Sequence, residues 1–155
     1  MNALVVGGSG MLAQTSLWLA EHGYTVSVIG RNPQKLGKLA DKNQNILPIS
    51  VDYNHQELLC NRLQKSILSS GPFDVIVAWI HSNEKQIIHT ISSENNQHAR
   101  NRWSLFHQIQ LGFMIEHNRS RWLTHDEIST GVINAIKLKM KQSVVGTLTP
   151  WSMRP

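Results

Sequence analysis

Three small residues at fixed spacing, Gly7, Gly10 and Ala13, could shape a ligand-binding loop in this chain of 155 residues. They follow a short apolar run, residues 2–6, and lead into residues 11–22, which have the spacing of a helix. Glycine adopts backbone conformations closed to other residues and lets the backbone approach a bulky group. The N–H groups and the positive dipole end of the following helix favour a phosphate at its start. The spacing therefore predicts a phosphate-binding loop.

The surrounding elements strengthen this interpretation. Gly23 ends the predicted helix, and residues 24–29 form a second apolar strand, which completes a strand–loop–helix–strand unit. That order is typical of a dinucleotide-binding site, in which the loop holds the pyrophosphate. The residues predicted to line it are Gly7, Gly8, Ser9, Gly10, Met11 and Leu12. The alternative is a tight strand-to-helix turn that binds nothing.

The end of the second strand predicts which dinucleotide is bound. Proteins that prefer NAD often carry a carboxylate there, whereas this chain has Arg31 and Asn32, with Lys35 one turn later. A guanidinium holds a 2′-phosphate through paired, charge-assisted hydrogen bonds. We therefore expect NADP(H) to be preferred over NAD(H). The alternative is a solvent-exposed arginine at the start of a helix.

Four segments in order resemble the short-chain dehydrogenase/reductase family, in particular its extended and atypical branches. They are Gly-Gly-Ser-Gly-Met-Leu-Ala at 7–13, Val-Ile-Gly-Arg-Asn at 28–32, Val-Asp-Tyr at 51–53 and Gly-Pro-Phe-Asp-Val-Ile-Val-Ala at 71–78. The resemblance covers about the first half of the chain. It implies a nicotinamide cofactor, with Asp52 beside the adenine and Ala78 beside the ribose on the nicotinamide side.

The second half departs from that family at its catalytic signature, Tyr-x-x-x-Lys. The only tyrosines are Tyr24 and Tyr53, and the residues four positions later are Val28 and Glu57. Two function classes therefore stay open: a small reductase with another proton donor, and a dinucleotide-binding or redox-sensing protein without chemistry. A nucleic-acid or protein-interaction module on the same scaffold is a third class, which the glycine loop disfavours.

Two histidines are candidates for a replacement proton donor. His81 and His107 each follow a predicted strand, where open α/β sheets bind their ligands. Histidine exchanges a proton near neutral pH, which suits it to general acid–base catalysis. The alternative is a pair of surface or hydrogen-bonded histidines. No two histidines have the i, i+4 spacing of a helical zinc pair, so no metal site is predicted.

Alternating patterns over the chain predict an α/β class: a Rossmann-like, doubly wound, mostly parallel sheet with helices on both faces. The whole chain, residues 1–155, is expected to be one domain. Pro48 restricts its predicted strand, residues 46–51, to a free edge or a strand start. The other expected elements are a helix at 55–70, an apolar strand at 73–80, a short helix at 84–92, a polar loop at 93–101 and a strand at 102–106.

The carboxyl-terminal third has its own local signals. Residues 117–119 form a good hairpin turn between strands placed within 108–116 and 120–123. Thr124 and Glu127 have the spacing of a capping box at the start of a helix. A last strand over 144–148 and a tail over 150–155 complete the expected order.

Composition limits the possible partners. The net charge of +5 is concentrated in residues 81–155, which carry nine basic and five acidic side chains. Because no nucleic-acid recognition motif accompanies them, we interpret these charges as solvated faces that also attract an anionic cofactor. No apolar run would span a membrane, no signal peptide is expected, and the lone Cys60 suits a reducing compartment, so the predicted location is cytoplasmic. Tryptophans in the second half suggest a homo-oligomer.

Overall fold

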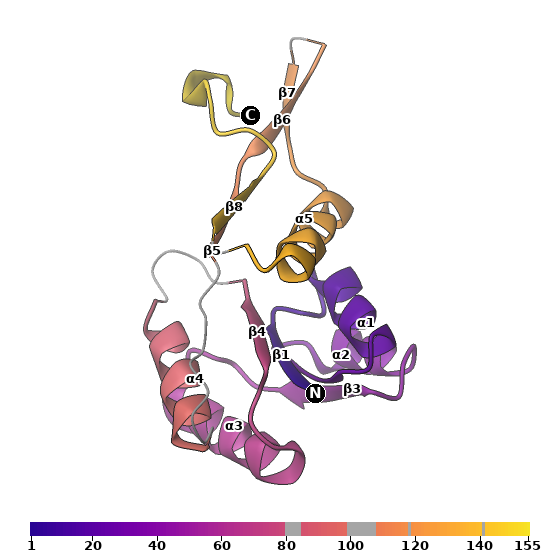
Figure 1. The fold of residues 1–155 in the computed structure, drawn as a ribbon, viewed down its shortest axis with the longest axis vertical. Coiled ribbons are helices and arrows are strands. Elements are labelled where there is room, and N and C mark those ends of the chain that lie inside the picture. The colour runs from indigo at the N-terminus through magenta and orange to yellow at the C-terminus, as the bar shows by residue number, and fades with distance from the viewer. Residues whose placement is uncertain (80–84, 99–107, 118, 141) are drawn as a thin grey trace. The chain divides into compact units, whose positions relative to one another are not determined.

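The computed structural model of the chain describes residues 1–79, 85–98, 108–117, 119–140 and 142–155 (Figure 1). Tertiary contacts divide the chain into two units, Met1–Ser104 and Leu105–Pro155, called here the N-terminal unit and the C-terminal unit. Each unit is described by itself, and the prediction of a single domain over residues 1–155 stays a prediction. The strand predicted at 102–106 lies outside the described residues.

The N-terminal unit is built on a four-stranded parallel sheet with the strand order β3-β2-β1-β4. The strands are β1 (Asn2–Val6), β2 (Thr25–Gly30), β3 (Ile46–Ser50) and β4 (Val75–Ala78). The helices between and after them are α1 (Ala13–Glu21), α2 (Pro33–Ala40), α3 (Gln56–Ser70) and α4 (Lys85–His98). Figure 1 shows α1 and α2 on one side of this sheet and α3 and α4 on the other. The predicted α/β, Rossmann-like fold is confirmed.

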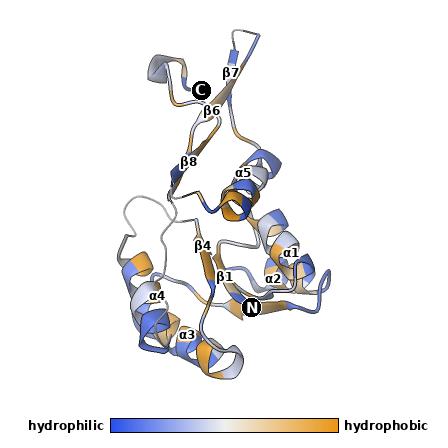
Figure 2. Cartoon of the chain, in the orientation of Figure 1, coloured by the Kyte–Doolittle hydropathy of each residue, from blue (hydrophilic) through white to orange (hydrophobic). Residues whose placement is uncertain are grey.

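The core of this unit surrounds the central strand. Residues 3–6 of β1 are completely buried, and Figure 2 shows the hydrophobic colour along β1 and β4. Leu59, Leu63 and Ile67, which lie on one face of α3, pack into the same core. Burial of these apolar side chains fixes the sheet beneath the glycine loop.

Pro48 lies in β3, at one edge of the sheet, as predicted. The N–H of Val26 donates to the carbonyl of Asn45 (2.8 Å), and the N–H of Val51 donates to the carbonyl of Gly30 (3.1 Å). Since alternate residues of a parallel strand face the neighbouring strand, Pro48 turns its nitrogen away from β2. The missing N–H therefore costs the sheet no hydrogen bond.

Helix α4 corrects the prediction of a short helix followed by a polar loop at 93–101. It continues to His98 because its polar side chains make tertiary hydrogen bonds. The side chain of the buried Asn95 accepts from the N–H of Phe73 (2.8 Å) and donates to the carbonyl of Phe73 (3.1 Å). Glu94 accepts from the Gln64 amide at 3.0 Å. The polar side chains at the end of α4 therefore connect this helix to α3 and to Phe73.

The described residues of the C-terminal unit form two small sheets, one α-helix and a short 3-10 helix, η2 (Trp151–Met153). Strands β5 (Gln108–Leu111) and β8 (Gln142–Val145) pair in parallel, β6 (Phe113–Glu116) and β7 (Arg119–Trp122) form the predicted hairpin, and α5 spans His125–Leu138. The single strand expected within 108–116 is broken at Gly112, where a Cβ would lie 2.0 Å from the Thr147 carbonyl oxygen. The last strand ends at Val145, short of the predicted 144–148, because Gly146 has φ +80°.

Candidate dinucleotide-binding site

The glycine loop lies where three strands of the N-terminal unit end. The N–H of Gly7 donates to the carbonyl of Ile29 (2.9 Å), and the N–H of Trp79 donates to the carbonyl of Val6 (3.1 Å). Gly7 has φ +80°, a conformation that favours glycine, and it starts the turn from β1 toward α1. The loop thus occupies the carboxyl edge of the sheet, where open α/β folds bind ligands.

Gly8 is required by packing within the protein. A Cβ on Gly8 would lie 2.6 Å from Ser16 Oγ, 2.7 Å from Val28 Cγ1 and 2.8 Å from Val5 Cγ1. The single O–H of Ser16 has two acceptors within reach, the carbonyl oxygens of Gly8 (3.3 Å) and Leu12 (3.1 Å), so the loop is tied to the buried face of helix α1. Gly8 thus makes a close approach of the loop to α1, β1 and β2, which the spacing of Gly7, Gly10 and Ala13 does not predict.

Gly10 differs, because none of the described residues requires a glycine there. Its φ is not positive, and an added Cβ would meet only the Gly7 carbonyl oxygen among the described residues, at 3.8 Å. The N–H groups of Gly10 and Ala13 close turns of the loop, at 3.2 and 3.0 Å. Among the described residues, the N–H groups of Gly8 and Ser9 have no acceptor, and Leu12 gives α1 no side-chain cap. Space and donors therefore remain at the start of α1.

Arg31 and Asn32 follow β2 at the same edge. Arg31 is exposed, and its Cζ lies 5.6 Å from the ring centroid of Tyr53. Asn32 is the N-cap of α2, because its Oδ1 accepts from the N–H of Lys35 at 2.9 Å. Its side-chain oxygen is therefore engaged within the helix, and Arg31 carries the charge that a ligand would meet.

Asp52 and Ala78 lie at the ends of the two outer strands of this sheet. Asp52 follows β3, and its Oδ1 accepts from the N–H of Asn54 at 3.1 Å. Ala78 is the last residue of β4, is exposed, and pairs in register with Val6. Both stand at the carboxyl edge with the glycine loop, and their roles toward a cofactor stay predictions.

The catalytic candidates are not placed. His81 and His107 lie outside the described residues. Within the parts of the chain that the structure describes, no three His, Cys, Asp or Glu side chains are grouped to hold a metal ion. No helix among the described residues is both long and apolar enough to cross a membrane.

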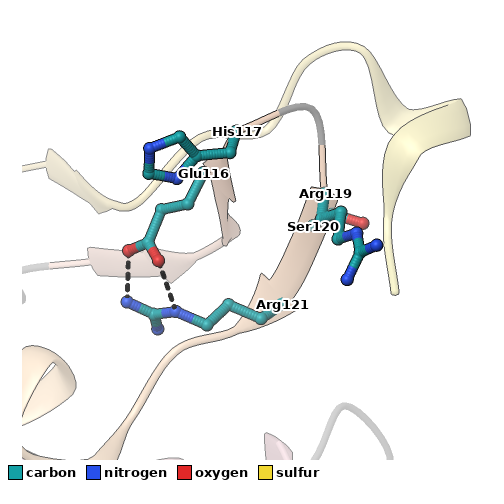
Figure 3. Close-up of a pocket in the computed structure, with 5 residues that line it drawn as sticks. All are labelled: Glu116, His117, Arg119, Ser120 and Arg121. Atoms are coloured by element: carbon teal, nitrogen blue, oxygen red, sulfur yellow. Dashed lines mark hydrogen bonds and ion pairs between the residues drawn. The ribbon is translucent and has the colours of Figure 1, made fainter.

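A surface depression in the C-terminal unit lies on the β6–β7 hairpin and shares no residue with the glycine loop. Figure 3 shows Glu116 and Arg121 pointing toward each other across it, and their Oε1 and Nη2 atoms are 2.7 Å apart. Arg121 also donates to both carboxylate oxygens of Glu127 at 2.9 Å. This arginine and the capping Thr124 lower the pKa of Glu127 to about 2, and Glu127 and Glu116 raise the pKa of Arg121. The charge of Arg121 is thus balanced by Glu116 and Glu127 within the protein.

Comparisons with known proteins agree with the fold. No family model and no curated protein matches the sequence. Glucose dehydrogenase of Caenorhabditis elegans is 18% identical with TM-score 0.54, over 63% of this chain and 48% of that chain. A Serratia marcescens short-chain dehydrogenase/reductase mutant is 18% identical with TM-score 0.55, over 72% and 54%. A 3-ketoacyl-ACP reductase from Sinorhizobium meliloti is 17% identical with TM-score 0.57, over 93% and 69%.

These similarities establish the fold of the chain. The chain spans about half of the length of the first two structures. Both structures are named as dehydrogenases.

Proposed function

We propose that this protein binds NADP(H) through the loop at residues 7–12 and is related to the short-chain dehydrogenases/reductases. The observation that carries the proposal is Gly10, a glycine without a role in packing, beside two N–H groups that have no acceptor among the described residues. A bound pyrophosphate would fill the space beside Gly10 and accept hydrogen bonds from these two N–H groups. The fold shared with solved oxidoreductases supports the same conclusion.

The residues at the carboxyl edge fit the parts of this cofactor. The backbone of Gly8, Ser9 and Gly10 would hold the pyrophosphate, and the exposed guanidinium of Arg31 would hold the 2′-phosphate. By resemblance to the family, Asp52 would lie beside the adenine and Ala78 beside the second ribose. When bound, NADP(H) supplies a hydride donor or acceptor.

Two functions are compatible with such a site. A small oxidoreductase is favoured by the names of the similar structures, all dehydrogenases or reductases in the examples above. A dinucleotide-binding or redox-sensing protein is favoured by the absence of Tyr-x-x-x-Lys from the sequence. Turnover of a panel of carbonyl compounds with NADPH decides between them, and alanine at His81 and His107 tests the proposed proton donors.

The binding site is tested at Gly10. Gly10→Val should abolish binding of NADPH, because its side chain would fill the space left for the pyrophosphate. The measurement is a fluorescence titration with NADPH, with circular dichroism to show that the variant is folded. Gly37→Ala in α2 is the matched control, because its added Cβ meets nothing within 4 Å. A folded Gly10→Val protein that binds NADPH as tightly as the wild type would contradict the assignment.

Cofactor choice is tested at Arg31. A hydrogen bond to a charged group contributes roughly 1.5–3 kcal/mol, and ~1.4 kcal/mol is one decade of affinity. Arg31→Ala should therefore weaken NADPH binding about ten- to a hundredfold and leave NADH binding unchanged, and Arg31→Asp should shift the preference toward NADH. Arg62→Ala, an exposed arginine on α3, is the matched control. If the wild type and Arg31→Ala both bind NADH and NADPH equally, Arg31 is a surface residue without a role in cofactor binding.

A further inference from the structure

We infer that Tyr53 is a positioning residue that holds the Arg31 guanidinium ready for the 2′-phosphate of the cofactor. The inference rests on the proposed function and extends it to a residue that follows β3. Arg31 is exposed, whereas Tyr53 is half-buried, and the guanidinium carbon of Arg31 lies 5.6 Å from the centre of the Tyr53 ring.

The Tyr53 ring is a fixed support. It packs against the core cluster that contains Val6, Ile29 and Leu59. The backbone beside it is fixed as well, because Asp52 accepts the N–H of Asn54 through its side chain (3.1 Å) and the N–H of His55 through its carbonyl (3.0 Å). We therefore expect the ring to restrict the arginine more than the arginine moves the ring.

The register of the sheet brings these two residues together. Gly30 pairs with Ser50, and the N–H of Val51 donates to the carbonyl of Gly30 at 3.1 Å. Arg31 follows β2 and Tyr53 follows β3, so both residues leave the sheet at this pair of strand ends. Strand pairing sets the stack before any ligand binds.

The cation–π contact leaves the guanidinium able to bind an anion. Attraction to the ring face occupies no hydrogen-bond acceptor, so the N–H donors of the guanidinium stay available to an anion. Among the described residues, no carboxylate forms an ion pair with Arg31, in contrast to Arg121. A long arginine on the surface otherwise loses side-chain freedom when it binds, and the ring has already restricted that freedom. The chemistry that this arrangement recognises is a phosphate monoester on the adenosine ribose.

Titration of NADPH and NADH into Tyr53→Leu and Tyr53→Phe tests this role. Tyr53→Leu should weaken NADPH binding about two- to fivefold and leave NADH unchanged, which is what an exposed cation–π contact is worth. Tyr53→Phe retains the ring and should match the wild type. Ile49→Ala, which removes another side chain that packs against the same core cluster, should leave the ratio of the two affinities unchanged.

The double variant Arg31→Ala/Tyr53→Leu makes the test specific. If the ring acts through the arginine, the double variant binds NADPH no more weakly than Arg31→Ala alone. In the absence of ligand, the NMR resonance of the Arg31 Nε–H should carry a ring-current shift in the wild type and in Tyr53→Phe, and should lose it in Tyr53→Leu.

The possible failures are distinguishable. Additive losses in the double variant, or an unchanged affinity ratio in folded Tyr53→Leu, would overturn the role of Tyr53 while the NADP(H) site stands. A wild-type protein that binds neither cofactor would overturn the proposed function and this inference with it. A wild type that binds NADH and NADPH equally would overturn the preference for NADP(H) and the role of Tyr53, and leave the glycine loop as the binding site.

Discussion

Replacing Gly8 by alanine should destabilise the protein through one methyl group. The added Cβ would lie under 3.0 Å from three side-chain atoms: Ser16 Oγ, Val28 Cγ1 and Val5 Cγ1. All three residues are completely buried on packed elements, so none of these atoms is the mobile end of a flexible side chain. Either the α1 helix moves away from the sheet, or both valines leave their rotamers.

The size of the effect follows from this crowding. An extra methyl in a well-packed core costs typically ~1–3 kcal/mol, and three simultaneous overlaps place Gly8→Ala at the upper end. For a chain of this size, ~1 kcal/mol lowers the melting temperature by about 2–4 °C, so we expect a loss of about 6–12 °C. The measurements are thermal and urea unfolding followed by far-ultraviolet circular dichroism.

Two other glycines are the controls for this prediction. Gly37→Ala should stabilise the protein by about 0.5–1 kcal/mol, because a glycine inside a helix costs that much relative to alanine and the position is open. Gly10→Ala should leave unfolding nearly unchanged, since its Cβ meets only one atom within 4 Å. If Gly8→Ala unfolds at the wild-type midpoint, the packing role of Gly8 and the steric reasoning behind it are refuted.

Two further predictions concern polar side chains outside the loop. Asn95→Ala should lower the free energy of unfolding by about 2–5 kcal/mol, because it leaves the buried N–H and carbonyl of Phe73 without partners. Urea unfolding measures this loss, with the exposed Gln97→Ala as the control. Equal midpoints for the two variants would contradict the prediction. The lowered pKa of Glu127, about 2 against an ordinary 4.5, means that its contribution to stability is complete above pH 4.5 and is lost as the pH falls toward 2. Glu127→Gln should therefore reduce stability at pH 7 and should lose less stability than the wild type between pH 4.5 and 2. The adjacent Asp126→Asn should lose stability over this pH range as the wild type does. If the stability of Glu127→Gln falls with pH in parallel with that of the wild type, the role of the ion pair is refuted.

The sequence predicts those parts of the fold that depend on local pattern. The β1–loop–α1–β2 order, the edge position of β3 and the Thr124 capping box all follow from residues close together along the chain. Apolar periodicity and turn residues carry such signals because each element must bury one face. Candidate site residues such as Arg31, Asp52 and Ala78 could be proposed from the sequence because each follows or ends a strand that the local pattern predicts.

Features that depend on contacts between distant residues could not be predicted. The helical end of α4 looks like a loop in the sequence, because Asn95 is polar and its partner Phe73 belongs to another element. The packing role of Gly8 depends on Val5, Val28 and Ser16 together. The stack of Arg31 on Tyr53 depends on the register between β2 and β3, which no local pattern specifies.

Pro48 has a consequence for how this protein behaves at high concentration. An exposed strand at the edge of a sheet is a template on which another chain can add a strand, and this is a common start of aggregation. The outward-facing nitrogen of Pro48 interrupts the row of donors along the outer edge of β3 at its middle residue. A second molecule that approached this side would find no continuous ladder to extend. We therefore expect the edge strand that carries Pro48 to protect that side of the sheet from self-association.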